Sequence, residues 1–117
     1  MKYEISEKEG IVVIAPKGKM TAGTDLGKLH DKIEEIVRMG ARKMVIDLGE
    51  VEWMDSHGLG VLVSAWTSLR KVQGELKLAR IPVKIEPLSI RGCFGSSPFG
   101  QRFSSVDKAL KSLRANS

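Results

Sequence analysis

The chain has 117 residues, of which 42% are hydrophobic and 28% are charged. This length supports one hydrophobic core and this composition is ordinary for a globular protein, so we expect a single domain spanning residues 1–117. The formal net charge is +5 and only 5% of residues are aromatic. Because the basic residues are scattered and aromatic residues are few, direct nucleic-acid binding is not expected.

Cysteine and histidine content limits the chemistry further. Cys93 is the only cysteine, so an intrachain disulfide cannot form, which favours a reducing compartment. His30 and His57 are the only histidines and have no Cys/His spacing around them, so neither a metal site nor a cofactor is predicted. The first residues lack the apolar segment of a signal peptide, and no apolar stretch approaches the ~20 residues of a membrane span. We therefore expect a cytoplasmic protein.

The chain begins with the pattern of a β-hairpin. Residues 3–7 and 11–16 predict two strands joined by a turn at Glu9 and Gly10. Apolar and charged residues alternate in the first strand, so we expect it at an edge of the sheet with one face in water. The second strand is more apolar and therefore more buried, and Gly18 is predicted to end it.

An amphipathic helix is predicted next. Thr24 has the side chain of a good N-cap, and Gly40 is suited to close the helix. Between them, apolar residues recur at the three- and four-residue spacing of a helix with one buried face. These residues are Leu26, Leu29, Ile33, Ile36 and Val37.

The second half of the chain continues the alternation of strands and helices. Residues 43–48 predict a buried strand, residues 59–72 a largely buried helix, and residues 75–81 a half-buried strand. A last helix is predicted to open at Ser104 or Ser105. This order implies an α/β fold in which strands pair in parallel through right-handed crossovers.

The segment before the long helix carries the most informative residues. Asp55 and Ser56 are the residue types that cap a helix N-terminus, and Gly58 and Gly60 suit a backbone that must approach another group closely. A hydroxyl beside a carboxylate at the positive end of a helix dipole is suited to receive or hold a phosphate. Two roles therefore remain open for Ser56, a phosphorylation site or an N-cap, and spacing alone favours the cap.

Other interpretations of this segment are weaker. The Ser56–His57 pair could indicate nucleophilic catalysis, but neighbours at a helix start point in different directions, and the surroundings lack a Gly-x-Ser-x-Gly turn. We therefore expect no enzymatic activity. The two tryptophans and four of the methionines are expected to pack in the core or in turns, and Met54 is also a candidate for partner contact. These residues are Met20, Met39, Met44, Met54, Trp53 and Trp66.

Residues 55–60, with the sequence Asp-Ser-His-Gly-Leu-Gly, resemble the Asp-Ser-x-Gly-Leu-Gly signature of STAS domains. The strand at 45–48 precedes the motif, as in that family, and bacterial anti-sigma factor antagonists are the most similar group. The resemblance covers residues 11–81 and 103–113. It implies a mixed β-sheet with the N-terminal hairpin at its edge and about four helices packed against it.

Residues 87–102 depart from the family pattern. Pro87 would break a helix begun at Pro82, and the residues after it are rich in glycine, proline and serine without helical or strand periodicity. Two explanations stay open, an irregular loop or a local reading-frame difference in the gene that preserves length. Residues 114–117 are expected to fray.

The resemblance implies a phosphorylation-switched regulator. With Ser56 unphosphorylated, it would bind an anti-sigma factor that is itself a serine kinase of the GHKL type, and so free a sigma factor for transcription. Phosphorylation would end the binding, and a serine phosphatase would reset it. The expected partner-binding residues are Thr21, Met54, Asp55, Ser56, His57, Gly58 and Leu59.

Thr21 marks a departure from the better-known antagonists. Many of them have Gly-Glu-Leu-Asp after the second strand, and that aspartate helps to engage the kinase. Here Lys19 and Thr21 replace the two acidic residues, so the choice of partner can differ. Two alternatives remain: a non-switching scaffold subunit of a stress-signalling or lipid-transport complex, or a small-ligand or nucleotide binder. We expect a monomer or a weak dimer.

Overall fold

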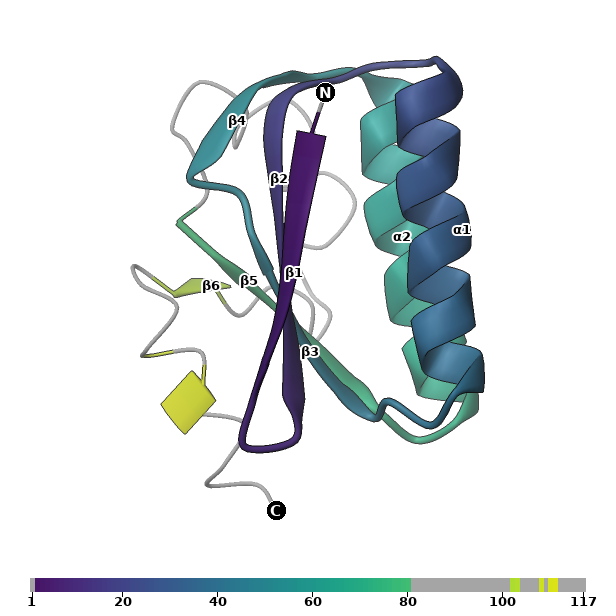
Figure 1. Cartoon of the computed structure of the whole chain (residues 1–117), viewed down its shortest axis with the longest axis vertical. Helices are drawn as coiled ribbons and strands as arrows, with labels where there is room; N and C mark the ends of the chain where they lie inside the picture. Colours follow the sequence, from purple (N-terminus) through teal and green to yellow (C-terminus); the bar gives the residue numbers. More distant parts are fainter. Residues whose placement is uncertain (1, 81–101, 104–107, 109, 112–117) are drawn as a thin grey trace.

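The computed structural model describes residues 2–80, 102–103, 108 and 110–111. They form a six-stranded mixed sheet with the order β1-β2-β3-β5-β6, and β4 also pairs with β2. Two helices, α1 and α2, lie side by side on one face of this sheet (Figure 1). The predicted mixed sheet is therefore confirmed. The prediction of about four helices is wrong for the described residues, which contain these two and the helical residues 108, 110 and 111.

Several predictions lie outside the described residues. They concern the helix start at Pro82, the irregular segment from 87 to 101, the opening of the last helix and the frayed C-terminus. Arg102 and Phe103 form the short strand β6, which pairs in parallel with β5.

The N-terminal hairpin is present as predicted. Strands β1 (Lys2–Lys8) and β2 (Ile11–Met20) are antiparallel, and β1 is at the edge of the sheet. Glu9 and Gly10 have φ values of 54° and 80°, as expected for the two central residues of a type I′ hairpin turn. Strand β2 does not end at Gly18, because after an irregularity there its second half pairs in parallel with β4 (Glu50–Met54).

The centre of the sheet is parallel, as the alternation of strands and helices predicts. Strand β3 (Lys43–Asp47) pairs with β2 on one side and with β5 (Glu75–Ala79) on the other. Strand β5 was expected to be half-buried, but its last four residues, Lys77 included, are all buried. The reason is its interior position between β3 and β6, with the main core on one face and the smaller cluster that contains Leu110 on the other.

Helix α1 (Thr24–Arg38) buries the predicted apolar face through Leu26, Leu29, Ile33 and Val37. Its N-cap is Gly23, without a side-chain hydrogen bond, so Thr24 is the first helical residue and not the predicted cap. Helix α2 (Ser56–Lys71) begins three residues before the predicted start at 59, because its capping residue lies further upstream.

The main core lies between the sheet and the two helices, and a smaller cluster lies on the opposite face of the sheet. Met20, Met44 and Met54 belong to the main core, as predicted. Met39 is instead 80% exposed at the C-cap of α1, and Trp53 is 43% exposed on β4. The predicted packing roles of these two residues are therefore wrong. The smaller cluster consists of Ile11, Val13, Val45, Ala79 and Leu110.

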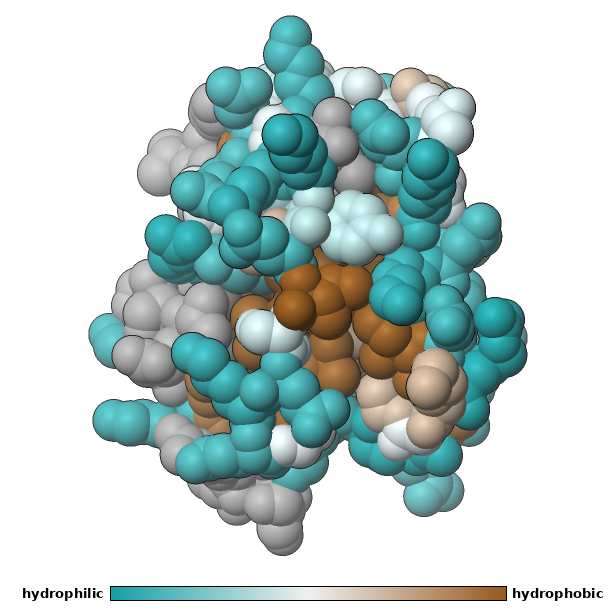
Figure 2. All heavy atoms as spheres, viewed as in Figure 1, coloured by the Kyte–Doolittle hydropathy of each residue, from teal (hydrophilic) through white to brown (hydrophobic). Residues whose placement is uncertain are grey.

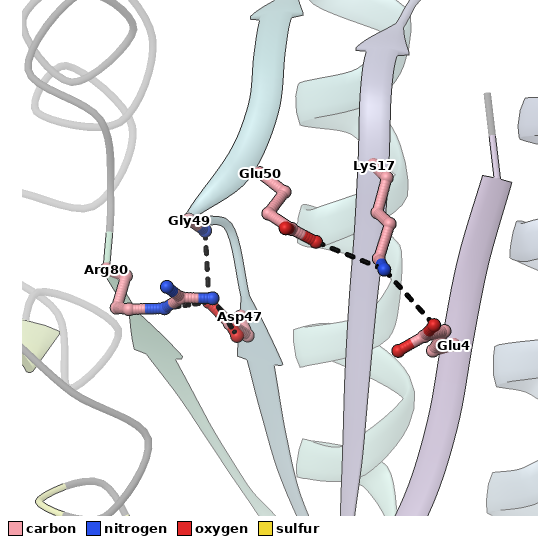
Figure 3. Close-up of polar contacts among 6 residues, drawn as sticks. All are labelled: Glu4, Lys17, Asp47, Gly49, Glu50 and Arg80. Atoms are coloured by element: carbon pink, nitrogen blue, oxygen red, sulfur yellow. Dashed lines mark hydrogen bonds and ion pairs between the residues drawn. The ribbon is translucent and has the colours of Figure 1, made fainter.

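The buried carboxylate of Asp47 connects the turn between β3 and β4 to the residue that follows β5. Asp47 accepts hydrogen bonds from Nε and Nη2 of Arg80 at 2.8 and 2.7 Å, and from the Gly49 N–H at 3.0 Å (Figure 3). Asp47 thus serves the fold at a strand end, as predicted. The contact holds the start of β4 next to the end of β5, and β4 leads directly into the candidate site. None of the described helices combines the length and apolarity needed to cross a bilayer.

Candidate functional site

The candidate site is built around Asp55, the N-cap of α2. Its Oδ1 accepts hydrogen bonds from the N–H groups of His57 and Gly58 at 2.9 and 3.1 Å. Its Oδ2 accepts a longer one from the Ala22 N–H, at 3.4 Å. In addition, the Asp55 N–H donates to the Met20 carbonyl at 3.3 Å. One residue thus joins the start of α2 to the loop between β2 and α1.

These contacts define the charge state of Asp55. Partial burial acts to raise the pKa of its carboxyl, but hydrogen bonds from the N–H groups of Gly58, Ala22 and His57 outweigh that effect. The nearby His57 ring, with Nδ1 3.5 Å from Oδ2, acts in the same direction. The net result is a pKa below the usual value. Asp55 is therefore ionised at neutral pH.

Gly58 lets α2 approach β2 closely. A Cβ at this position would overlap the carbonyl oxygen of Met20 and would lie 2.8 Å from Cγ of Met54. The expectation of a close approach is confirmed for Gly58. It is wrong for Gly60, because a Cβ there would meet nothing within 4 Å.

Ser56 is the first residue of α2, and its side chain is exposed. The capping hydrogen bonds are made by Asp55, so the interpretation of Ser56 as the N-cap is wrong. Ser56 instead lines an open groove of about 470 Å³ between the N-terminal ends of α1 and α2. We call this the N-terminal groove; its lining is Ala22, Gly23, Leu26, Gly27, His30, Ser56, His57, Gly60 and Val61.

A polar cluster behind the groove fastens the two helices to each other. Glu34 of α1 accepts hydrogen bonds from the Ser64 and Ser68 hydroxyls of α2 at 3.2 and 2.8 Å. Ser64 Oγ also lies 2.9 Å from Nε2 of His30. Because the Ser64 hydroxyl has one proton and gives it to Glu34, His30 donates to Ser64. The cluster sets the spacing of the helices that form the groove.

The structure brings most of the predicted site residues together. Thr21 is half-buried in the loop after β2, next to Ala22, and Leu59 is half-buried against the main core. The His57 side chain is 66% exposed. Met54 is different, since only 2% of it is exposed, and we leave it out of the accessible surface.

The α1 side of the groove was not predicted from the sequence. Gly27 is the one residue on this side that stands out in the sequence, because a glycine inside a helix lowers helix stability and so suggests another role. The structure shows that packing does not require it, since a Cβ there would meet nothing within 4 Å. The other α1 residues reach the site only through the packing of the two helices, which local sequence does not specify.

Comparison with known proteins assigns the family. The STAS domain family matches residues 2–109, and the chain belongs to it. BtrV of Bordetella bronchiseptica, named as a candidate anti-sigma factor antagonist, is 27% identical over 112 residues, which cover 95% of this chain and 96% of BtrV.

Solved structures show the same fold. An anti-sigma factor antagonist from Mycobacterium paratuberculosis has a TM-score of 0.78 at 24% identity, covering 97% of this chain and 93% of its own. The Bacillus cell fate determinant SpoIIAA in its phosphorylated form has a TM-score of 0.77 at 20% identity, covering 97% and 100%.

Proposed function

We propose that this protein is a non-enzymatic anti-sigma factor antagonist whose partner binding is switched by phosphorylation of Ser56. The observation that supports it most is the placement of Ser56, which is exposed in the N-terminal groove beside Asp55, the ionised N-cap of α2. Full-length similarity to BtrV supports the antagonist role. Among the similar folds is SpoIIAA, which is known in a phosphorylated form.

The unphosphorylated groove suits docking of a protein partner. Its floor is apolar at Leu26 and Val61, and Gly27 and Gly60 leave room for a partner's side chain. His57 lines it, and Thr21 precedes the lining residue Ala22 in the chain. The proposed partner is an anti-sigma factor that is a serine kinase of the GHKL type, and binding it would free a sigma factor in the cytoplasm.

Phosphorylation would change the charge of the groove and leave the fold intact. A phosphate adds ~1.5–2 negative charges at neutral pH, next to the carboxylate of Asp55. The N–H groups of His57 and Gly58 already bind Asp55, so the phosphate has no vacant cap to occupy and stays at the groove surface. A partner that docks there loses affinity through repulsion and desolvation. Removal of the phosphate by a serine phosphatase would restore binding.

The test is incubation of the purified protein with ATP and the serine kinase encoded in its gene neighbourhood, followed by intact-mass measurement. One added phosphate is expected on the wild type and none on Ser56→Ala. Thr24→Ala is the matched control, because Thr24 is also an exposed first residue of a helix, but it follows a glycine cap instead of a carboxylate. This variant should be phosphorylated normally.

Other results would contradict the proposed switch or favour one of the alternatives. Phosphate on Ser56→Ala, or its loss from Thr24→Ala, would contradict Ser56 as the switch. No transfer together with a stable complex with other subunits would favour the scaffold alternative. Thermal stabilisation by a nucleotide would favour the ligand-binding alternative.

A further inference from the structure

The edge strand β1 has the properties of an interaction surface. It pairs with β2 through seven consecutive residue pairs without a register shift, and among the described strands it has no neighbour on its other side. Six of its seven residues are exposed. It contains no proline and no bulge, two of the features that protect such an edge from pairing, and its charged residues Lys2, Glu4, Glu7 and Lys8 restrict which strand can pair with it.

A groove with an apolar part lies beside this edge. It has a volume of about 860 Å³, and its apolar lining comes from Ile5 and Val12 of the hairpin and from Ile36, Met39 and Ala41 at and just after the end of α1. Charged residues form its rim, namely Glu7, Glu9, Lys32, Arg42 and Lys43. Ile5 is 37% exposed and Met39 is 80% exposed. Viewed from the β1 side, Figure 2 shows hydrophobic atoms at the surface between β1 and α1. We call this the edge groove.

The charges of β1 indicate which strand could pair with this edge: β1 of a second copy of the chain, because the charge pattern of the strand is complementary to itself. In an antiparallel pair of two copies centred on Ser6, Glu4 of each copy faces Lys8 of the other, so two opposite-charge pairs form. Glu4 also pairs with Lys17 of its own chain at 3.1 Å, so its carboxylate then lies between two lysines. Centring on Ile5 would place Lys2 opposite Lys8, and centring on Glu7 would place two glutamates face to face. The charge pattern therefore selects the Ser6 register.

We propose that two copies of this chain associate through β1, in antiparallel pairing centred on Ser6. The two-fold axis is then perpendicular to the sheet, so the sheet continues across it and both helix layers lie on the same side. In this register Ile5 of each copy faces Glu7 of the other, so the partner strand covers part of the exposed Ile5 side chain. This apolar burial adds to the backbone hydrogen bonds of the strand pair.

The proposed dimer leaves the N-terminal groove open. The α1 residues that line the edge groove lie in the C-terminal part of the helix, from Lys32 onward. Those that line the N-terminal groove lie in its first part, up to His30. A dimer would therefore present two docking sites and bind a dimeric partner with increased avidity. The association itself does not depend on the proposed function.

Analytical ultracentrifugation of charge variants tests the pairing. Lys8→Glu puts like charges opposite each other twice, so we expect dimerisation to weaken about tenfold. Lys2→Glu is the matched control, since it changes the net charge equally but faces Gly10 in this register; its dimerisation should be unchanged. The double variant Glu4→Lys/Lys8→Glu restores the opposite-charge pairs and should dimerise more strongly than Lys8→Glu, although it also places a lysine beside Lys17. Circular dichroism confirms that each variant is folded.

Disulfide trapping tests the register. In a Cys93→Ser background, Ser6→Cys should form a crosslinked dimer on oxidation, because facing residues of an antiparallel pair have Cα atoms about 4.5–5.5 Å apart, within disulfide range. Ile5→Cys should crosslink much less. A wild-type protein that stays monomeric at every concentration overturns the proposal, and so does crosslinking of Ile5→Cys in preference to Ser6→Cys.

Discussion

The backbone of Gly58 lies against the carbonyl oxygen of Met20, so close that a Cβ would overlap it. This contact places the first turn of α2 on the end of β2. Gly58→Ala should therefore destabilise the protein by about 1–3 kcal/mol, because neither backbone can move without disturbing the core. Urea denaturation measures the difference.

Gly60 provides the control for that experiment. It lies two residues further along the same helix, has no positive φ, and a Cβ there would meet nothing within 4 Å. Gly60→Ala should stabilise the protein by up to about 1 kcal/mol through helix propensity. Equal effects of the two substitutions would contradict the close approach at Gly58.

The lowered pKa of Asp55 predicts a pH-dependent stability. Ionised Asp55 stabilises the folded state, and this contribution is complete above the ordinary pKa of 3.8 and is lost as the pH falls through the lower folded pKa. Asp55→Asn keeps a capping oxygen but removes the charge. The stability difference between wild type and Asp55→Asn should be largest near neutral pH and shrink in acid, as measured by urea denaturation at several pH values. A difference independent of pH would show that the charge plays no part.

The Asp47–Arg80 contact should contribute to stability despite its position near the surface. Asp47→Ala removes an acceptor whose side chain is 9% exposed and leaves both Arg80 and the Gly49 N–H without it. We expect a loss of about 2 kcal/mol, moderated because the Arg80 side chain is 46% exposed. Glu50→Gln tests an exposed ion pair, with Lys17, at the same end of the sheet, and should change stability little. A loss as small for Asp47→Ala as for Glu50→Gln would contradict the role of Asp47.

The polar cluster between the helices gives a fourth prediction. Glu34→Ala removes the acceptor for Ser64 and Ser68 and should cost about 1 kcal/mol of folding stability. It should also lower partner affinity, because the cluster sets the spacing of the helices that form the N-terminal groove. Glu35→Ala removes the neighbouring exposed glutamate, whose pair with Lys32 spans 3.7 Å, and should have almost no effect on either. Thermal unfolding and partner titration of both variants distinguish the two positions.

The regular elements of this fold were predictable because their periodicity is strong. The apolar face of α1, the hairpin turn and the parallel central strands follow from local patterns, and the structure has them. Strand β4 was missed because its five residues mix charged and apolar side chains and were assigned to the turn before the helix. It exists because it pairs with the last residues of β2, a long-range contact with no local signature.

The details of the candidate site could not be predicted from local sequence, because they depend on how the elements pack. Asp55 and Ser56 are both capping residue types, and only the structure shows that Asp55 takes the cap and leaves the Ser56 hydroxyl at the surface. Met54 was expected in the core and was also a candidate for partner contact; its pairing with Met20 buries it, in agreement with the first expectation only. The motif therefore located the site, whereas its boundaries were set by contacts between elements far apart in sequence.

The most direct test of the proposed switch is the affinity of the anti-sigma factor kinase for this protein before and after phosphorylation of Ser56, measured by isothermal titration calorimetry. Unmodified protein should bind, and the phosphorylated form should bind on the order of a hundredfold more weakly, with an unchanged circular dichroism spectrum. Equal affinity of the two forms would contradict the switch, even if the kinase modifies Ser56.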